Sequence, residues 1–77
     1  GVSSLGEGSR VLMLEDVVTT GGSSLRGIEQ LRRAGFDIQG LFCLVDREEG
    51  GRAAIEASGV PMTALYKRSD FPGGDTA

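Results

Sequence analysis

Two adjacent acids, followed by a short run of hydroxyl and glycine residues, are the part of this sequence best suited to chemistry. Glu15 and Asp16 end an apolar run, and residues 19–24 read Thr-Thr-Gly-Gly-Ser-Ser before an amphipathic pattern begins. Glycines let a chain turn sharply and approach a ligand closely, and the first amides of a helix favour an anion. We therefore predict an anion site between a strand and a helix, with extra donors from the hydroxyls of Thr19, Thr20, Ser23 and Ser24.

The acidic pair restricts the kind of ligand that this turn would bind. Carboxylates in contact with a phosphate would repel it, so Glu15 and Asp16 are expected to face hydroxyl groups or a metal ion. A ligand with a phosphate at one end and ribose hydroxyls in its middle satisfies both halves of the motif. The alternative is an ordinary strand–loop–helix turn with a serine cap at Ser23 or Ser24.

Length and composition exclude several classes of protein. The 77 residues allow one small domain, and the single cysteine, Cys43, cannot form an internal disulfide. Cys43 lies in an apolar run and is predicted to be buried, which is consistent with a reducing, cytoplasmic setting. A net charge of -3 argues against general nucleic-acid binding, and the lack of histidine excludes histidine catalysis. No apolar run approaches the roughly 20 residues of a membrane span. The absence of an initial Met suggests a fragment or a processed chain.

Periodicity, glycines and prolines divide the sequence into alternating strands and helices. Near-continuous apolar strands are typical of a parallel sheet covered on both faces, and short connections through helices imply right-handed crossovers. The expected fold class is α/β, in the order β-α-β-α-β, with one domain over residues 10–66. The expected segments are a Gly- and Ser-rich linker or loop (1–9), a strand (10–15), a helix (22–34) capped by Gly35, a strand (38–45), a helix (51–58), a strand (61–66) and a carboxyl-terminal tail of frayed coil (67–77).

A second group of charged residues follows the second long strand. Residues 46–49 read Asp-Arg-Glu-Glu. Because parallel strands end at the same edge of a sheet, this group is expected beside the Glu15–Asp16 loop. The planar guanidinium of Arg47 suits bidentate capture of a carboxylate. The alternative is a solvated turn in which Arg47 pairs locally with Glu48 or Glu49, an interaction worth little at a surface.

The motif and its spacing resemble a known family. Residues 11–23 are similar to the phosphoribosyl pyrophosphate signature of type I phosphoribosyltransferases: four hydrophobic residues, two acids, then small residues with Thr and Gly. The distance to Val45-Asp46-Arg47, and the ending at residues 65–71, make residues 8–71 similar to the carboxyl-terminal half of orotate phosphoribosyltransferase. The resemblance implies that phosphoribosyl pyrophosphate binds to Glu15, Asp16, Val17, Val18, Thr19, Thr20, Gly21, Gly22 and Ser23.

The resemblance also implies a fold and a reaction. The fold would be part of the Rossmann-like parallel sheet of a type I phosphoribosyltransferase. Orotate and phosphoribosyl pyrophosphate would give orotidine 5'-monophosphate and pyrophosphate, a step of pyrimidine (UMP) biosynthesis. Glu15 and Asp16 would be the catalytic residues, and Thr19 and Arg47 would contact orotate. Mg²⁺ would be bound mainly through the substrate rather than by a protein metal site, and the full-length protein would be a homodimer.

Only about half of such an enzyme is present in the chain. The family's mobile catalytic loop and its amino-terminal half would precede this segment, so the isolated chain is expected to be poorly stable or to associate, and to be weakly active or inactive. The main rival is a regulatory protein that binds a phosphoribosyl ligand on the same fold. A phosphoryl-receiver module is less favoured because it leaves residues 19–22 without a role. A dinucleotide-binding domain is weaker still because the glycine spacing differs.

Overall fold

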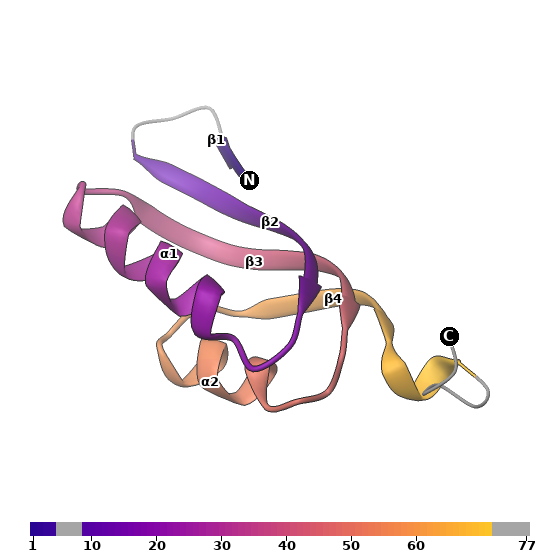
Figure 1. Cartoon of the computed structure of the whole chain (residues 1–77). Helices are drawn as coiled ribbons and strands as arrows, with labels where there is room; N and C mark the ends of the chain where they lie inside the picture. Colours follow the sequence, from indigo (N-terminus) through magenta and orange to yellow (C-terminus); the bar gives the residue numbers. More distant parts are fainter. Residues whose placement is uncertain (5–8, 72–77) are drawn as a thin grey trace.

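A twisted sheet with two helices beneath it makes up the part of the chain that the computed structural model describes, residues 1–4 and 9–71 (Figure 1). The strands lie in the order β1-β2-β3-β4, with β2, β3 and β4 parallel and β1 antiparallel to β2. The predicted α/β class, its parallel strands and the β-α-β-α-β order are confirmed. The elements are β1 (Val2–Ser4), β2 (Arg10–Val18), α1 (Gly22–Arg33), β3 (Asp37–Asp46), α2 (Gly51–Ala57), β4 (Met62–Lys67) and a 3-10 helix, η1 (Arg68–Asp70).

The two ends of the chain are more ordered than the sequence predicts. The prediction of a linker over residues 1–9 is wrong for Val2–Ser4, which pair with Val11–Met13 as an edge strand. The Gly- and Ser-rich segment has no alternating apolar pattern that would predict a strand. Residues 2–4 form a strand only because they pair with β2. The predicted tail is also wrong at its start, because Lys67 ends β4 and Arg68–Asp70 form η1. The remainder of both predictions, residues 5–8 and 72–77, lies outside the described residues.

The parallel strands and helices otherwise begin and end close to their predicted positions. The main difference is β2, which continues through Val18 instead of ending at Glu15. Helix α1 ends at Arg33 with Ala34 as its C-cap, so the prediction that Gly35 is the cap is wrong by one residue. Gly35 follows the cap with a φ of +91°. The left-handed glycine that ends α1 is therefore Gly35, as predicted, but it follows the cap residue instead of being the cap.

Both helices cover the same face of the sheet because both crossovers move in the same direction across it (Figure 1). The core lies between this face and the helices, and Cys43 is wholly buried there, as predicted. Burial raises the pKa of the Cys43 thiol, so the side chain remains a neutral, small hydrophobe. The buried apolar side chains are Val11, Met13, Val18, Ile28, Ile38, Leu41, Cys43, Ile55, Val60 and Met62.

The opposite face of the sheet is apolar and exposed. Side chains alternate between the two faces of a strand, so the neighbours of the buried residues point away from the helices. These include Leu14, Phe42, Leu44 and Leu65, which are between 38% and 54% exposed. The prediction that both faces are covered is therefore wrong for residues 1–4 and 9–71. The apolar run of each strand is suited to a sheet that is covered on both faces. Within the described residues, the helices cover only one face of the sheet.

This open face leads to a prediction for the isolated chain. We expect the 77-residue chain to self-associate at micromolar concentration, because large exposed apolar surfaces drive association. Leu44→Lys places a charge on the open face, on the inner strand β3, and should reduce the sedimentation coefficient measured by analytical ultracentrifugation. Glu29→Lys, on an exposed position of α1, is the matched control and should leave association unchanged. A wild-type chain that remains monomeric at about 100 μM would contradict the prediction.

Candidate functional site

The two predicted site loops meet at one edge of the sheet. Val18 at the end of β2 is in register with Asp46 at the end of β3. The Arg47 amide donates to the Val18 carbonyl at 2.9 Å, and the Gly51 amide donates to the Thr19 carbonyl at 3.0 Å. The predicted juxtaposition of the loops is confirmed, and backbone hydrogen bonds join them directly.

Glycine is required where the two loops touch. Gly21 has a φ of +89° and is the N-cap residue of α1, with no side-chain hydrogen bond at the cap. The alternative of a serine cap is therefore wrong. A Cβ on Gly51 would lie 2.5 Å from Val18 Cγ1 and 2.6 Å from the Thr19 carbonyl oxygen. The two loops approach this closely only because Gly51 has no side chain.

A cavity of about 310 Å³ lies inside the first of these loops. It opens where the polypeptide leaves β2 and enters α1, so the first amides of a twelve-residue helix lie at its rim. Most of the predicted phosphoribosyl-binding residues border it, although Thr20 and Gly22 do not. The lining residues are Glu15, Asp16, Val17, Val18, Thr19, Gly21, Ser23 and Ser24.

The two acids have different surroundings within this cavity. Because β2 continues to Val18, Glu15 and Asp16 are consecutive strand residues and point to opposite faces of the sheet. Glu15 is half-buried on the side of α1, and its Oε2 accepts a hydrogen bond from Ser24 Oγ at 3.0 Å. Asp16 is exposed. The sequence prediction that the Ser24 hydroxyl is an anion donor misses this contact, since Ser24 is buried and already donates to Glu15.

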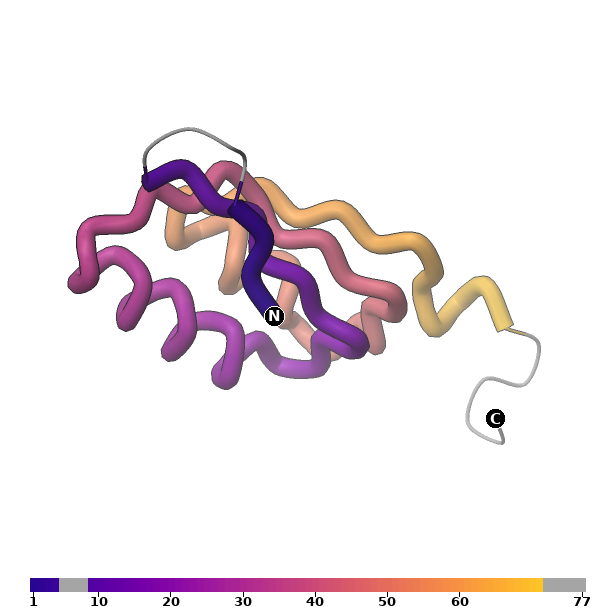
Figure 2. Tube along the Cα trace, turned by 90° about the horizontal axis from the view of Figure 1, so that it is seen from above, coloured from indigo at the N-terminus to yellow at the C-terminus, as the bar shows by residue number. Residues whose placement is uncertain are grey.

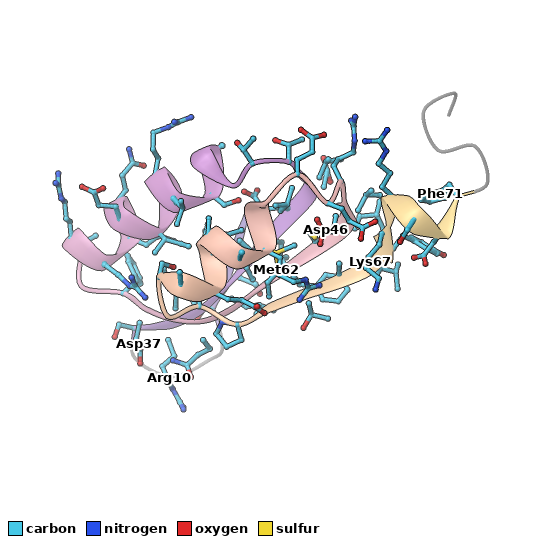
Figure 3. The ribbon with its side chains drawn as sticks, turned by 90° about the horizontal axis from the view of Figure 1, so that it is seen from below. Arg10, Asp37, Asp46, Met62, Lys67 and Phe71 are labelled. Atoms are coloured by element: carbon cyan, nitrogen blue, oxygen red, sulfur yellow. The ribbon has the colours of Figure 1, made fainter. Side chains whose placement is uncertain are left out.

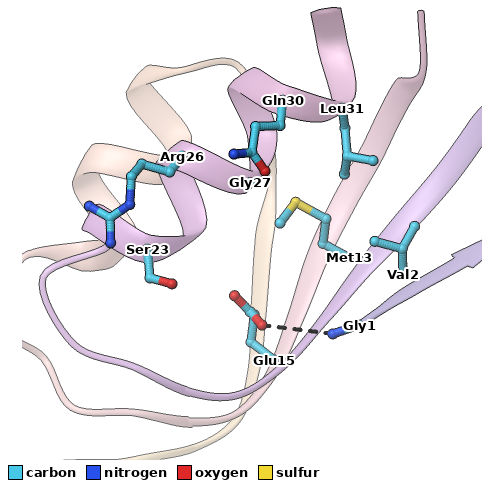
Figure 4. Close-up of a pocket in the computed structure, with 9 residues that line it drawn as sticks. All are labelled: Gly1, Val2, Met13, Glu15, Ser23, Arg26, Gly27, Gln30 and Leu31. Atoms are coloured by element: carbon cyan, nitrogen blue, oxygen red, sulfur yellow. Dashed lines mark ion pairs between the residues drawn. The ribbon is translucent and has the colours of Figure 1, made fainter. Parts of the chain in front are cut away.

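A second cavity, of about 490 Å³, adjoins the first on the other side of Glu15 (Figure 4). It lies between α1 and the β1–β2 pair, and Figure 4 shows the Glu15 carboxylate between Ser23 and the Gly1 amino group. Gly1 N lies 3.9 Å from Glu15 Oε1. Arg26 is the cationic side chain that lines this cavity within the described part of the chain. Glu15 and Ser23 therefore line both cavities.

Arg47 lies at the edge of the sheet where the two loops meet, with a weak local partner. Its side chain is 50% exposed, and its Nη2 lies 3.5 Å from Glu49 Oε2. The local pairing considered for Arg47 is thus present for Glu49, while Glu48 contacts η1 instead. An exposed pair of this kind is worth about 1 kcal/mol at most, so Glu49 competes only weakly with an incoming carboxylate.

A metal ion would depend on ligand oxygens at this site. In the described ranges, 1–4 and 9–71, no group of three or more His, Cys, Asp or Glu side chains could hold a metal. Glu15 and Asp16 are oxygen donors of the type that Mg²⁺ prefers, and that ion commonly completes its shell with water and substrate phosphates. Because the two side chains point to opposite faces of β2, one carboxylate could hold a magnesium ion whose other oxygens come from a ligand and water. Across the same residues, no helix has the length and apolar character needed to cross a membrane.

Comparisons with known proteins agree on one family. No family model matches the chain. The orotate phosphoribosyltransferase of Aquifex aeolicus is 50% identical over 67 residues, which are 87% of this chain and 37% of that protein. A crystal structure of orotate phosphoribosyltransferase from Aeropyrum pernix superposes with a TM-score of 0.77 at 34% identity, covering 79% of this chain and 36% of that one. The Mycobacterium tuberculosis enzyme in complex with phosphoribosyl pyrophosphate gives 0.75 at 36% identity, covering 79% and 38%.

The fold of the described residues is that of part of a type I phosphoribosyltransferase. The chain spans about a third of the length of the curated relatives that it matches. Over most of its length, the chain matches orotate phosphoribosyltransferases in sequence and in fold.

Proposed function

We propose that this chain carries the phosphoribosyl and orotate contacts of an orotate phosphoribosyltransferase, within a domain over residues 10–66. The observation that supports this most strongly is the cavity bordered by Glu15, Asp16 and Thr19, joined by backbone hydrogen bonds to the loop of Arg47. A solved relative is named as a complex with phosphoribosyl pyrophosphate, and 38% of that chain is matched here. The ligand of that relative is of the kind that the turn at residues 19–24 and the acidic pair are predicted to bind.

The roles of the residues follow from the charges that change during transfer. A bond forms between the orotate ring nitrogen and the anomeric carbon, while the bond from that carbon to the pyrophosphate oxygen breaks. The ring nitrogen loses its proton in this step, and the departing pyrophosphate takes up a proton. Positive charge develops on the ribose ring, and Glu15 and Asp16 hold the ribose hydroxyls where their charges favour it. Thr19 and Arg47 position orotate against the anomeric carbon. The 5'-phosphate is bound by the loop residues Thr20, Gly21, Gly22 and Ser23 at the start of α1. Of these, Gly21 and Ser23 line the cavity, as do Val17 and Val18.

The proposal extends to a metal, to assembly and to location. Magnesium, when bound, supplies positive charge that neutralises the departing pyrophosphate. The carboxylates of Glu15 and Asp16 are the protein oxygens available to it. We place the full-length protein in a homodimer and in the cytoplasm, where the single buried thiol of Cys43 is stable.

Binding and activity test the proposal separately. Calorimetric titration of the chain with phosphoribosyl pyrophosphate and magnesium, then with orotate, measures the two sites directly. Activity is measured in a chimeric enzyme in which this chain replaces the 67 matching residues of the Aquifex aeolicus relative. We expect both ligands to bind and the chimera to form orotidine 5'-monophosphate. Binding of the sugar phosphate without orotate would support the regulatory alternative, and an inactive but folded chimera would contradict the proposal.

Arg47 gives the sharpest test of orotate binding. In the chimera, Arg47→Ala should raise the KM for orotate by about 10- to 100-fold, because a hydrogen bond to a charged group is worth about 1.5–3 kcal/mol. Glu49→Gln should lower that KM by up to about 3-fold, because it removes the weak competitor of the substrate carboxylate. Arg33→Ala is the matched control: Arg33 also pairs with a glutamate, but it lies in the last turn of α1. An unchanged KM for orotate in Arg47→Ala would refute the assignment.

A further inference from the structure

The residue before Arg47 is a buried acid with two partners. Asp46, the last residue of β3, is only 3% exposed. Its Oδ1 accepts the Glu48 amide at 2.8 Å, and its Oδ2 lies 3.5 Å from Arg52 Nε on α2. Figure 3 shows Asp46 and Lys67 at one end of the sheet and Arg10 and Asp37 at the other. A buried carboxylate is costly unless it is paired, so these contacts fix the start of the loop that carries Arg47.

The residue after Arg47 is fixed as well, by a contact across the sheet edge. Glu48 has a φ of +58°, which is uncommon for a residue other than glycine, asparagine or aspartate. Its Oε1 accepts the Ser69 amide of η1 at 2.8 Å, and this hydrogen bond lowers the pKa of the Glu48 carboxyl. Figures 1 and 2 show η1 continuing beyond β4 at the end of the sheet where the loops lie. Arg47 is therefore held between two anchored neighbours.

Arg52, the partner of Asp46, connects that residue to two further elements. Its Nη1 donates to the Met62 carbonyl of β4 at 2.7 Å and lies 3.4 Å from Glu56 Oε2 on the next turn of α2. The Arg52 side chain is 38% exposed, whereas the Asp46 side chain is 4% exposed. The loop is thus tied to β3, α2, β4 and η1 through Asp46, Arg52 and Glu48, and none of these contacts uses the Arg47 side chain.

We propose that Asp46 and Glu48 are positioning residues that fix the backbone on either side of Arg47, so that its guanidinium meets the carboxylate of the base at a set distance from the phosphoribosyl cavity. This inference rests on the proposed function for its ligand and on the observed contacts for its geometry. It predicts that substitution of either residue weakens recognition of orotate, the base that carries the carboxylate. Recognition of phosphoribosyl pyrophosphate should remain unchanged.

The test measures both substrates in the chimeric enzyme. Asp46→Ala should raise the KM for orotate about 10-fold while the KM for phosphoribosyl pyrophosphate changes less than about 2-fold. Asp46→Asn retains an oxygen that can accept the Glu48 amide, so it should restore most of the loss. Glu48→Gly keeps the positive φ accessible but removes the contact with Ser69, and should raise the KM for orotate by about 3-fold. Glu56→Ala, which removes only the surface partner of Arg52, is the matched control and should change neither KM.

Hydrogen exchange of the Glu48 amide in the same variants measures the loop without a ligand. The wild-type amide should be protected, and Asp46→Ala should accelerate its exchange at least about 10-fold. Faster exchange with an unchanged KM for orotate would overturn the positioning role, as would equal increases in both KM values. Unchanged exchange would show that Asp46 does not fix the loop. If the wild-type chimera does not bind orotate, the proposed function fails. The exchange rate of the Glu48 amide still shows whether Asp46 fixes the loop.

Discussion

Gly51→Ala is expected to lower the free energy of unfolding by about 2 kcal/mol, the middle of the range for overpacking a tightly packed site. The added methyl group would overlap Val18 Cγ1 and the Thr19 carbonyl oxygen, at 2.5 and 2.6 Å. Relief of the overlap requires the start of α2 to move away from the β2–α1 loop. That movement breaks the hydrogen bond from the Gly51 amide to Thr19. We therefore expect weaker binding of phosphoribosyl pyrophosphate together with the loss of stability.

Urea denaturation of the chimeric enzyme measures this effect, with an expected fall of about 1 M in the midpoint. Gly27→Ala is the matched control, because the nearest atom to its added Cβ is the flexible end of Met13, at 3.2 Å. Gly27 is also in the interior of α1, where alanine is favoured over glycine by up to about 1 kcal/mol. If both variants unfold at the wild-type midpoint, the close approach of the two loops contributes nothing to stability.

Asp16→Asn is expected to lower kcat of the chimeric enzyme by about 100-fold, the size of effect seen when one preorganised electrostatic group is removed. The amide has nearly the shape of the carboxylate but carries no charge to favour the positive ribose ring. Asp16 is exposed at the cavity, so the substitution should leave the unfolding free energy nearly unchanged. Initial-rate kinetics with both substrates separate an effect on kcat from an effect on binding.

Asp37→Asn provides the comparison for this experiment. Asp37 is also an exposed strand aspartate, but it begins β3, at the end of the sheet away from Asp46 (Figure 3). It should retain wild-type kcat. Equal activities for the two variants would remove Asp16 from the proposed chemistry and leave Glu15 as the acid in contact with the ribose.

The sequence predicts the parts of the site that are contiguous in the chain. The acids, the small-residue turn and the start of α1 form a single run, and parallel topology then places the Arg47 loop at the same edge. Partners that are distant in the chain leave no local signal. The hydrogen bond from Ser24 to Glu15 depends on how α1 packs, and the need for glycine at position 51 arises only where two loops meet.

The role of Asp46 is hidden for a similar reason. In the sequence it is one of several charges in residues 46–49, and a cluster of that kind is usually solvated. Its burial follows from the register with Val18 and from the position of Arg52 on α2. The edge strand β1 escapes prediction because three residues without periodicity become a strand only by pairing with β2. In each case a tertiary neighbour, absent from the local pattern, determines the outcome.

Because Cys43 is buried, its reaction with a thiol reagent can report when the helices separate from the sheet. The thiol has no exposed surface and lies between the sheet and its helices, and it is the single cysteine of the sequence. A thiol-labelling reagent can react only after the helices separate from the strand beneath them. Under conditions where reclosing is faster than labelling, the modification rate gives the free energy of that separation at one known atom. A ligand that bridges the β2–α1 and β3–α2 loops would slow labelling without touching the sulfur, so occupancy of the site can be followed by mass spectrometry.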